Sequence, residues 1–374
     1  MNRSIRLARR AGAKRVTAVL ASAALAAFAV GSSVAAGTAA GAAPAASRSA
    51  AARASYGFNA PDALAVDGHD LWVANRAGNS VTELSTANGG FIRRISGGRY
   101  RFSTPTAILG DGKHIFVANR AGSVTELNAS NGSWVRTISG KAYHLSAPSA
   151  LKLDGAHLFV VDSAGGLTEL NTSNGSLVRT IRGARYGFDD PIAIALAGAD
   201  LFVVNHAGNS VTEVNAGTGA WVRTISGRNF GLDQPAGIAF DGADLWVTDP
   251  PTNSVTEINP AAGSFVQVLN SSVYGFGSPT VATSAGQRVY VASPPGHSPM
   301  VTAFGAGSGH FYWYMCNTNG PYHFNNPSAL VVSGGDVWVA NAGSTEFVTQ
   351  YGMAPQNSLT EMNAISGDLI RTFS

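Results

Sequence analysis

The sequence has very little cysteine and few charged residues. Its 374 residues include one cysteine, Cys316, and only 13% are Asp, Glu, Lys or Arg. A single cysteine excludes an intramolecular disulfide, so packing must stabilise the fold. The low charge and the 44 glycines favour many turns and short strands over long surface helices.

The chain also lacks an apolar run of the roughly 20 residues that a membrane-spanning helix needs. The longest candidate, Val16–Val30, follows six basic residues and precedes the small-residue pattern Ala43-Pro44-Ala45. This order is typical of a signal peptide, which we place at 1–45, with an uncleaved anchor as the alternative. We therefore expect a secreted or cell-wall-associated protein, in which the small, polar residues 46–55 form a flexible linker.

The excess of basic over acidic residues in the chain comes from the predicted signal peptide. All six charged residues in positions 1–45 are Lys or Arg, which leaves 19 basic and 22 acidic residues in the remainder. Nucleic-acid binding would need a basic face in the folded part. We therefore expect no nucleic-acid partner and no membrane contact beyond the export signal.

From position 56 onward the chain repeats itself with a period of about 44 residues. The clearest mark is an aromatic residue, a bulky residue two positions later and a proline five positions later. The aromatic residues of the seven copies are Tyr56, Tyr100, Tyr143, Tyr186, Phe230, Tyr274 and Tyr322. Seven marks argue against a six-membered ring.

Each copy reads as four short strands. In the first copy they are Ala63–Val66, Leu71–Ala74, Ser80–Leu84 and Phe91–Ile95. Asn88-Gly89 between the last two is a strong hairpin signal, because both residues tolerate positive φ. Four strands per repeat predict an all-β, seven-bladed β-propeller over 56–374, with antiparallel blades. The last copy ends in a complete fourth strand, so the ring should close by packing without exchanging a strand.

The repeats resemble NHL/YVTN-type propellers. The residues that carry the resemblance are the runs at 235–242 (PAGIAFDG), 71–75 (LWVAN) and 79–84 (NSVTEL). The resemblance implies the propeller fold. It implies no single activity, because such propellers include binding modules as well as enzymes of the streptogramin-lyase and lactonase type.

The residues that recur from blade to blade are interpreted as structural. A Glu in the third strand precedes an Arg in the fourth by ten positions, as in Glu83 and Arg93, and both disappear together in the sixth copy at Ala303 and Trp313. This joint loss favours a cross-strand ion pair over a ring of catalytic carboxylates. The repeated aromatic residues are expected to seal interfaces between blades. Short polar residues at the ends of the second strands are expected to cap turns.

The repeat is broken in blades 5 to 7, mostly in loops predicted on one face. The loops after the second strands are rich in proline in copies five and six, and the seventh carries an insertion, 342–357. Because loops carry most functions of repeat folds, we predict a ligand site there. Its residues are Asp249, His297, Phe347, Tyr351 and Met353.

No catalytic motif is present: there is no His-Glu-x-x-His, Cys-x-x-Cys or Gly-x-Ser-x-Gly. We therefore predict no catalytic residue, no metal ligand and no cofactor. The function expected is that of a monomeric, non-enzymatic binding or scaffold module for a protein, a cell-wall polymer or a glycan. The alternative is a metal-dependent propeller enzyme of the streptogramin-lyase or lactonase type, in which Asp249 and His297 would have to serve.

Overall fold

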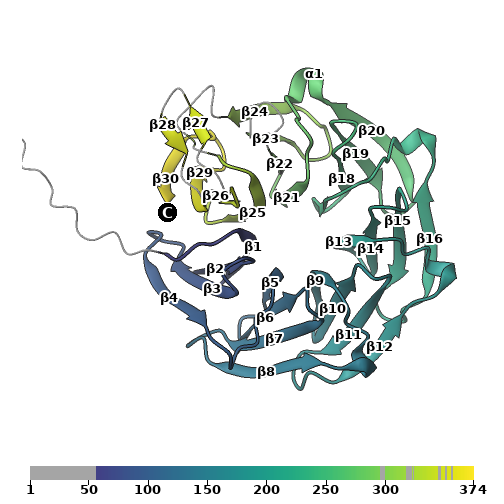
Figure 1. Cartoon of the computed structure of the whole chain (residues 1–374). Coiled ribbons are helices and arrows are strands. Elements are labelled where there is room, and N and C mark those ends of the chain that lie inside the picture. The colour runs from purple at the N-terminus through teal and green to yellow at the C-terminus, as the bar shows by residue number, and fades with distance from the viewer. Residues whose placement is uncertain are drawn as a thin grey trace, which may run out of the picture. The chain divides into compact units, whose positions relative to one another are not determined.

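Each repeat folds into one four-stranded antiparallel sheet, and seven such sheets form a ring in the computed structural model (Figure 1). The structure describes residues 56–294, 300–316, 322, 324–343, 347–349, 352–354 and 357–374, with only the backbone at 271, 272, 347–349 and 352–354. The first strand of each blade is innermost, and successive inner strands contact one another around the whole ring. The predicted fold, a seven-bladed β-propeller, is confirmed.

Blades 1 to 4 are built, from inner to outer strand, as follows. They comprise β1 (Pro61–Asp67), β2 (Asp70–Asn75), β3 (Ser80–Ser85) and β4 (Phe91–Ser96); β5 (Pro105–Gly110), β6 (His114–Asn119), β7 (Ser123–Asn128) and β8 (Trp134–Ser139); β9 (Pro148–Asp154), β10 (His157–Asp162), β11 (Gly166–Asn171) and β12 (Leu177–Ile181); and β13 (Pro191–Ala197), β14 (Asp200–Asn205), β15 (Ser210–Asn215) and β16 (Trp221–Ser226).

Blades 5 to 7 follow the same order, and the seventh carries an additional hairpin. They comprise β17 (Ile238–Phe240), β18 (Leu245–Asp249), β19 (Ser254–Asn259) and β20 (Ser264–Asn270); β21 (Val281–Ala285), β22 (Arg288–Ser293), β23 (Met300–Gly305) and β24 (Phe311–Cys316); and β25 (Pro327–Ser333), β26 (Asp336–Asn341), β29 (Ser358–Asn363) and β30 (Leu369–Phe373), with β27 (Phe347–Thr349) and β28 (Gly352–Ala354) between β26 and β29. Single helical turns occur at η1 (Lys141–Tyr143), η2 (Ala184–Tyr186), η3 (Arg228–Phe230) and α1 (Ser271–Tyr274).

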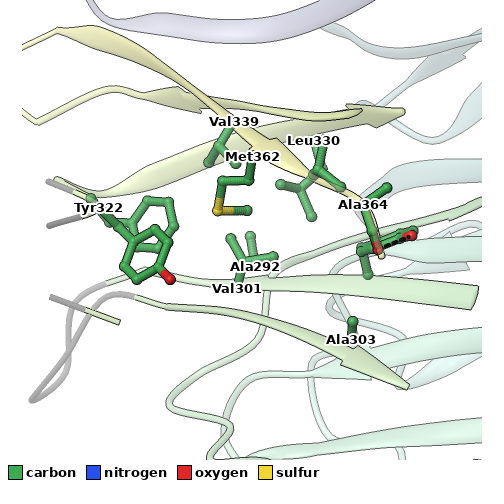
Figure 2. Packing of buried hydrophobic residues seen from close by; sticks show 11 residues of the cluster. Ala292, Val301, Ala303, Tyr322, Leu330, Val339, Met362 and Ala364 are labelled. Atoms are coloured by element: carbon green, nitrogen blue, oxygen red, sulfur yellow. Dashed lines mark hydrogen bonds between the residues drawn. The ribbon is translucent and has the colours of Figure 1, made fainter. Parts of the chain in front are cut away.

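The hydrophobic core lies between the blades. Seven clusters of buried apolar side chains each draw on two neighbouring blades, one cluster for each interface of the ring. Figure 2 shows the cluster between blades 6 and 7, where Met362 and Leu330 face Ala292 and Val301. A single blade has an apolar surface on both faces, so it needs a neighbour on each side.

The repeated aromatic residues seal these interfaces, as predicted. The aromatic ring at the start of a repeat stacks on the one two positions later in five copies, as in Tyr56 on Phe58, with ring centroids 5.4 Å apart. The Tyr186 hydroxyl donates a hydrogen bond to the Gly219 carbonyl at 2.8 Å. These rings fix the path of each connection between blades.

The ring closes between blades 7 and 1, and each of these blades uses only its own consecutive strands. The ring of Phe373 stacks on Trp338 at 5.7 Å and meets Tyr56 edge-on at 5.6 Å. On the other side of the junction, the Ala60 backbone N–H donates to Asn357 Oδ1 at 2.6 Å. Closure by packing, without strand exchange, is confirmed.

The packing at this junction predicts a large effect of Phe373→Ala. Phe373 is 7% exposed, and removal of a buried Phe side chain costs about 3–5 kcal/mol of unfolding free energy. We expect a correspondingly lower urea midpoint. Ile370→Ala on the same strand is the control, because Ile370 is 43% exposed and should cost much less. Equal losses in the two variants would contradict closure by this contact.

Candidate functional site

The recurring Glu and Arg form ion pairs inside five of the seven blades. They lie opposite each other in register, with Arg93 Nε 2.9 Å from Glu83 Oε2. Equivalent pairs occur in four further blades, at Glu126–Arg136, Glu169–Arg179, Glu213–Arg223 and Glu361–Arg371. In blade 5 the Gln267 amide donates to Glu257 instead, at 2.5 Å. The predicted structural role of the carboxylates is confirmed.

The same arginines also tie each blade to the next. Arg179 Nη2 donates to the carbonyl of Gly217 in the following blade at 2.7 Å, and Arg371 Nη1 donates across the ring junction to the Asn88 carbonyl at 2.7 Å. The buried Glu therefore orients a guanidinium that bridges two blades. A carboxylate used in this way is not available for acid–base chemistry.

Burial makes one of these pairs sensitive to pH. Desolvation raises the pKa of Glu83 from 4.5 to about 7, and the nearby Arg93 only partly offsets it. Between these two pH values the folded protein binds more protons than the unfolded chain. The stability that Glu83 contributes is therefore complete below about pH 4.5 and is lost as the pH rises through 7.

Replacing Glu83 by Gln should remove this pH dependence, because an amide does not ionise. We expect the stability of Glu83→Gln relative to the natural protein to rise between about pH 5 and about pH 7.5. Urea midpoints at both pH values measure the difference. Ser85→Ala on the same strand is the non-titrating control. A Glu83→Gln difference that is the same at both pH values would contradict the raised pKa.

The polar residue that ends the second strand holds the incoming connection in place. Asn75 Oδ1 accepts from the Asn59 backbone N–H, and Asn75 Nδ2 donates to the Thr82 hydroxyl. That hydroxyl donates in turn to the Tyr56 carbonyl at 3.0 Å. The main partner of Asn75 thus lies sixteen residues earlier in the chain. The local turn cap expected from the sequence forms at Asp162, whose Oδ1 accepts from the Ala164 backbone N–H at 3.0 Å. Thr side chains on the third strands repeat the last bond in all seven blades.

Asp249, the first predicted site residue, occupies this polar position in blade 5. Its carboxylate is buried and accepts from the Asp233 N–H at 2.5 Å and from the Thr252 hydroxyl at 2.8 Å. Burial raises its pKa. Both of its oxygens are therefore engaged by the protein's own loops.

The other predicted site residues lie on or beside the insertion and the sixth loop. Phe347 and Met353 belong to the hairpin β27–β28, in which Phe347 pairs with Ala354. His297 and Tyr351 lie outside the described residues. Ligand binding by this set remains a prediction.

Sequence reasoning missed a charged side chain at the centre of the ring. A cavity of about 330 Å³ lies along the inner strands β9, β13, β17 and β21 and includes Lys152. Burial lowers the pKa of this lysine. The sequence did contain a signal for this lysine, because the other six copies carry an uncharged residue at the same position of the repeat. These residues are Ala65, Leu109, Ala195, Ala239, Thr283 and Val331.

Blade 6 departs from the repeat in a coordinated way. Ala303 and Trp313 face each other where other blades pair Glu with Arg. The Trp313 indole N–H donates to the Ile365 carbonyl of blade 7 at 2.9 Å, so it replaces the bridge that arginine makes elsewhere. Tyr290, buried beside it, donates to the Ala364 carbonyl at 2.9 Å. The junction is thus retained without a carboxylate.

These changes produce an aromatic groove between blades 6 and 7, with a volume of about 450 Å³. Its main lining residues are Arg288, Tyr290, Tyr312, Ser333, Gly334 and Ile365. We call it the blade 6–7 groove. The Arg288 guanidinium lies 4.1 Å from the centre of the Tyr312 ring, and Tyr312 is 40% exposed.

A glycine makes room for this stack. Gly305 stands where the other blades have Ser or Asn, and a Cβ atom at this position would lie 2.7 Å from Ser308 Oγ and 3.1 Å from the Tyr312 hydroxyl oxygen. The φ of Gly305 is not positive, so the glycine matters here through the space that it leaves beside these two side chains and not through backbone conformation. The equivalent groove between blades 4 and 5 is lined by Asp200, Glu213 and Arg223 instead.

Other kinds of site find no support in the described ranges. Within 56–374, apart from the residues not described, no three His, Cys, Asp or Glu side chains gather as a metal site would require. In the same part of the chain, no helix has the length and apolar character needed to cross a bilayer.

These features define a seven-bladed β-propeller whose sixth blade departs from the repeat. The sequence profile of the family described as outer membrane protein assembly factor BamB matches residues 61–269, and the chain belongs to this family. The match spans β1 to β20, so it ends before the divergent sixth blade.

Solved structures share the fold at low sequence identity. A computationally designed protein, Ika8, is 15% identical with a TM-score of 0.61, covering 84% of this chain and 86% of its own. Hydrazine synthase of Kuenenia stuttgartiensis is 18% identical with a TM-score of 0.63, covering 76% of this chain and 93% of its own. Among curated proteins, none matches the sequence. At such identities the similarity shows the fold alone.

Proposed function

We propose that the protein is an exported, monomeric, non-enzymatic β-propeller that acts as a binding or scaffold module for a protein, a cell-wall polymer or a glycan. In this proposal residues 1–45 are the signal peptide and 46–55 a linker. The blades are of the NHL/YVTN type. The protein works outside the cell membrane, either secreted or associated with the wall.

The observation that carries this proposal is the contrast between blade 6 and its neighbours. In the regular blades the recurring Glu side chains are bound to Arg or Gln. In blade 6 this pair is replaced by Ala303 and Trp313, and the groove beside it carries the exposed ring of Tyr312. Exposed aromatic and Arg side chains are typical of recognition surfaces.

The family supports the same reading. Its description is that of an assembly factor, and assembly is a task of binding. The enzyme alternative has less support, because Asp249 is buried and bonded to Asp233 and Thr252. The loop residues Phe347, Tyr351 and Met353 remain proposed contacts.

Site-specific photo-cross-linking tests the proposal. A photo-reactive benzoyl-phenylalanine in place of Tyr312 should form high-mass adducts in cells that produce the protein, because the side chain lines the groove. The same probe in place of Val222 is the matched control, since Val222 lines the equivalent groove between blades 4 and 5. Gel electrophoresis detects the adducts. Identical patterns from both positions, or none from position 312, would contradict a binding role for blade 6.

A further inference from the structure

The blade 6–7 groove contains a cation without a carboxylate partner. In blade 3 the first residue of the second strand, His157, lies with its Nδ1 2.7 Å from Glu169 Oε1. In blade 2 the same position, His114, lies with its Nε2 3.7 Å from Glu126 Oε1. Blade 6 has Arg288 at this position, and the Glu is replaced by Ala303. No acidic side chain of the described residues forms an ion pair with Arg288.

The guanidinium is held in place but keeps donors free for a ligand. It stacks on Tyr312, and its Nη1 donates to the Ile365 carbonyl at 3.3 Å. A guanidinium has five N–H donors, and this is the hydrogen bond that it forms within the described structure. Its planar, paired donors match the two oxygens of a carboxylate.

The rest of the groove suits a sugar ring. The exposed phenol of Tyr312 can pack against the C–H face of a pyranose, and Ser333 and the glycines Gly334 and Gly335 bring polar groups to the opposite wall. The volume of about 450 Å³ falls within the range of sites for small ligands. In the equivalent groove between blades 4 and 5, Arg223 is paired with Glu213 and Asp200 would repel an anion.

We propose that the blade 6–7 groove binds a uronic-acid unit of an acidic polysaccharide, with its carboxylate on Arg288 and its ring against Tyr312. The inference rests on the proposed function and specifies its ligand. This inference explains together why blade 6 departs from the repeat at positions 288, 303, 305 and 312. Ala303 removes the internal competitor for Arg288, and Gly305 leaves space beside the hydroxyl groups of Ser308 and Tyr312.

Calorimetric titration with trigalacturonate, and with its methyl ester as the uncharged analogue, tests the inference. We expect trigalacturonate to bind and the ester to bind about tenfold more weakly or worse, because loss of a hydrogen bond to a charged group costs about 10- to 100-fold in affinity. Citrate, an anion without a sugar ring, should not compete at equal concentration.

Two variants use residues that sibling blades already carry, which favours retention of the fold. Arg288→Asp introduces the residue found at Asp70, Asp200, Asp244 and Asp336, and Tyr312→Val introduces the residue found at Val222. Each should weaken trigalacturonate binding by about tenfold or more, with an unchanged circular dichroism spectrum. Val222→Ala, in the groove between blades 4 and 5, should bind as the natural protein does.

The outcomes separate the two proposals. Equal binding of acid and ester, effective competition by citrate, or unchanged binding in both groove variants would overturn the uronate site. If trigalacturonate fails to bind while position 312 still gives cross-links, the uronate inference is wrong and the binding module stands. If neither is observed, both are wrong.

Discussion

The interface between neighbouring blades is the constraint on which the whole structure depends. Each blade is a twisted sheet with apolar side chains on both faces, and a single blade cannot cover either face by itself. The seven buried clusters therefore lie between blades, including the one that joins blade 7 to blade 1. Because every blade needs two neighbours, the ring has to close. The edge-on contact of Phe373 in blade 7 with Tyr56 in blade 1 has the same importance as any contact between other neighbouring blades.

Polar side chains supplement this apolar packing. The buried Glu of a regular blade holds an Arg that donates to a carbonyl of the next blade. On the other side of the ring junction, Asn357 accepts from the Ala60 backbone. A buried carboxylate is costly unless it is paired, and here the pair also satisfies a carbonyl in a turn. The recurrence of these residues is thus explained by the joints between blades and not by catalysis.

Blade 6 shows how such a joint can be modified without opening the ring. The indole N–H of Trp313 and the hydroxyl of Tyr290 satisfy the carbonyls of Ile365 and Ala364, so the bridge to blade 7 remains. With Ala303 in place of the Glu, Arg288 has no carboxylate of the described residues in the position where Glu169 contacts His157. A basic and aromatic groove results where blade 4 has its Glu213–Arg223 ion pair.

The sequence by itself determined the fold class, the number of blades and the role of the Glu–Arg pairs. These depend on local periodicity and on substitutions that occur together, both of which are visible in one chain. The predicted strands of blade 1 differ from those observed by at most two residues at either end, since hydrogen-bonded pairing extends beyond the apolar core of each strand. Only the tertiary structure placed Lys152 beside a cavity, engaged Asp249 with Asp233 and joined Arg288, Tyr312 and Ile365 in one groove. Residues from adjacent blades meet there through the curvature of the ring, which no spacing along the chain encodes.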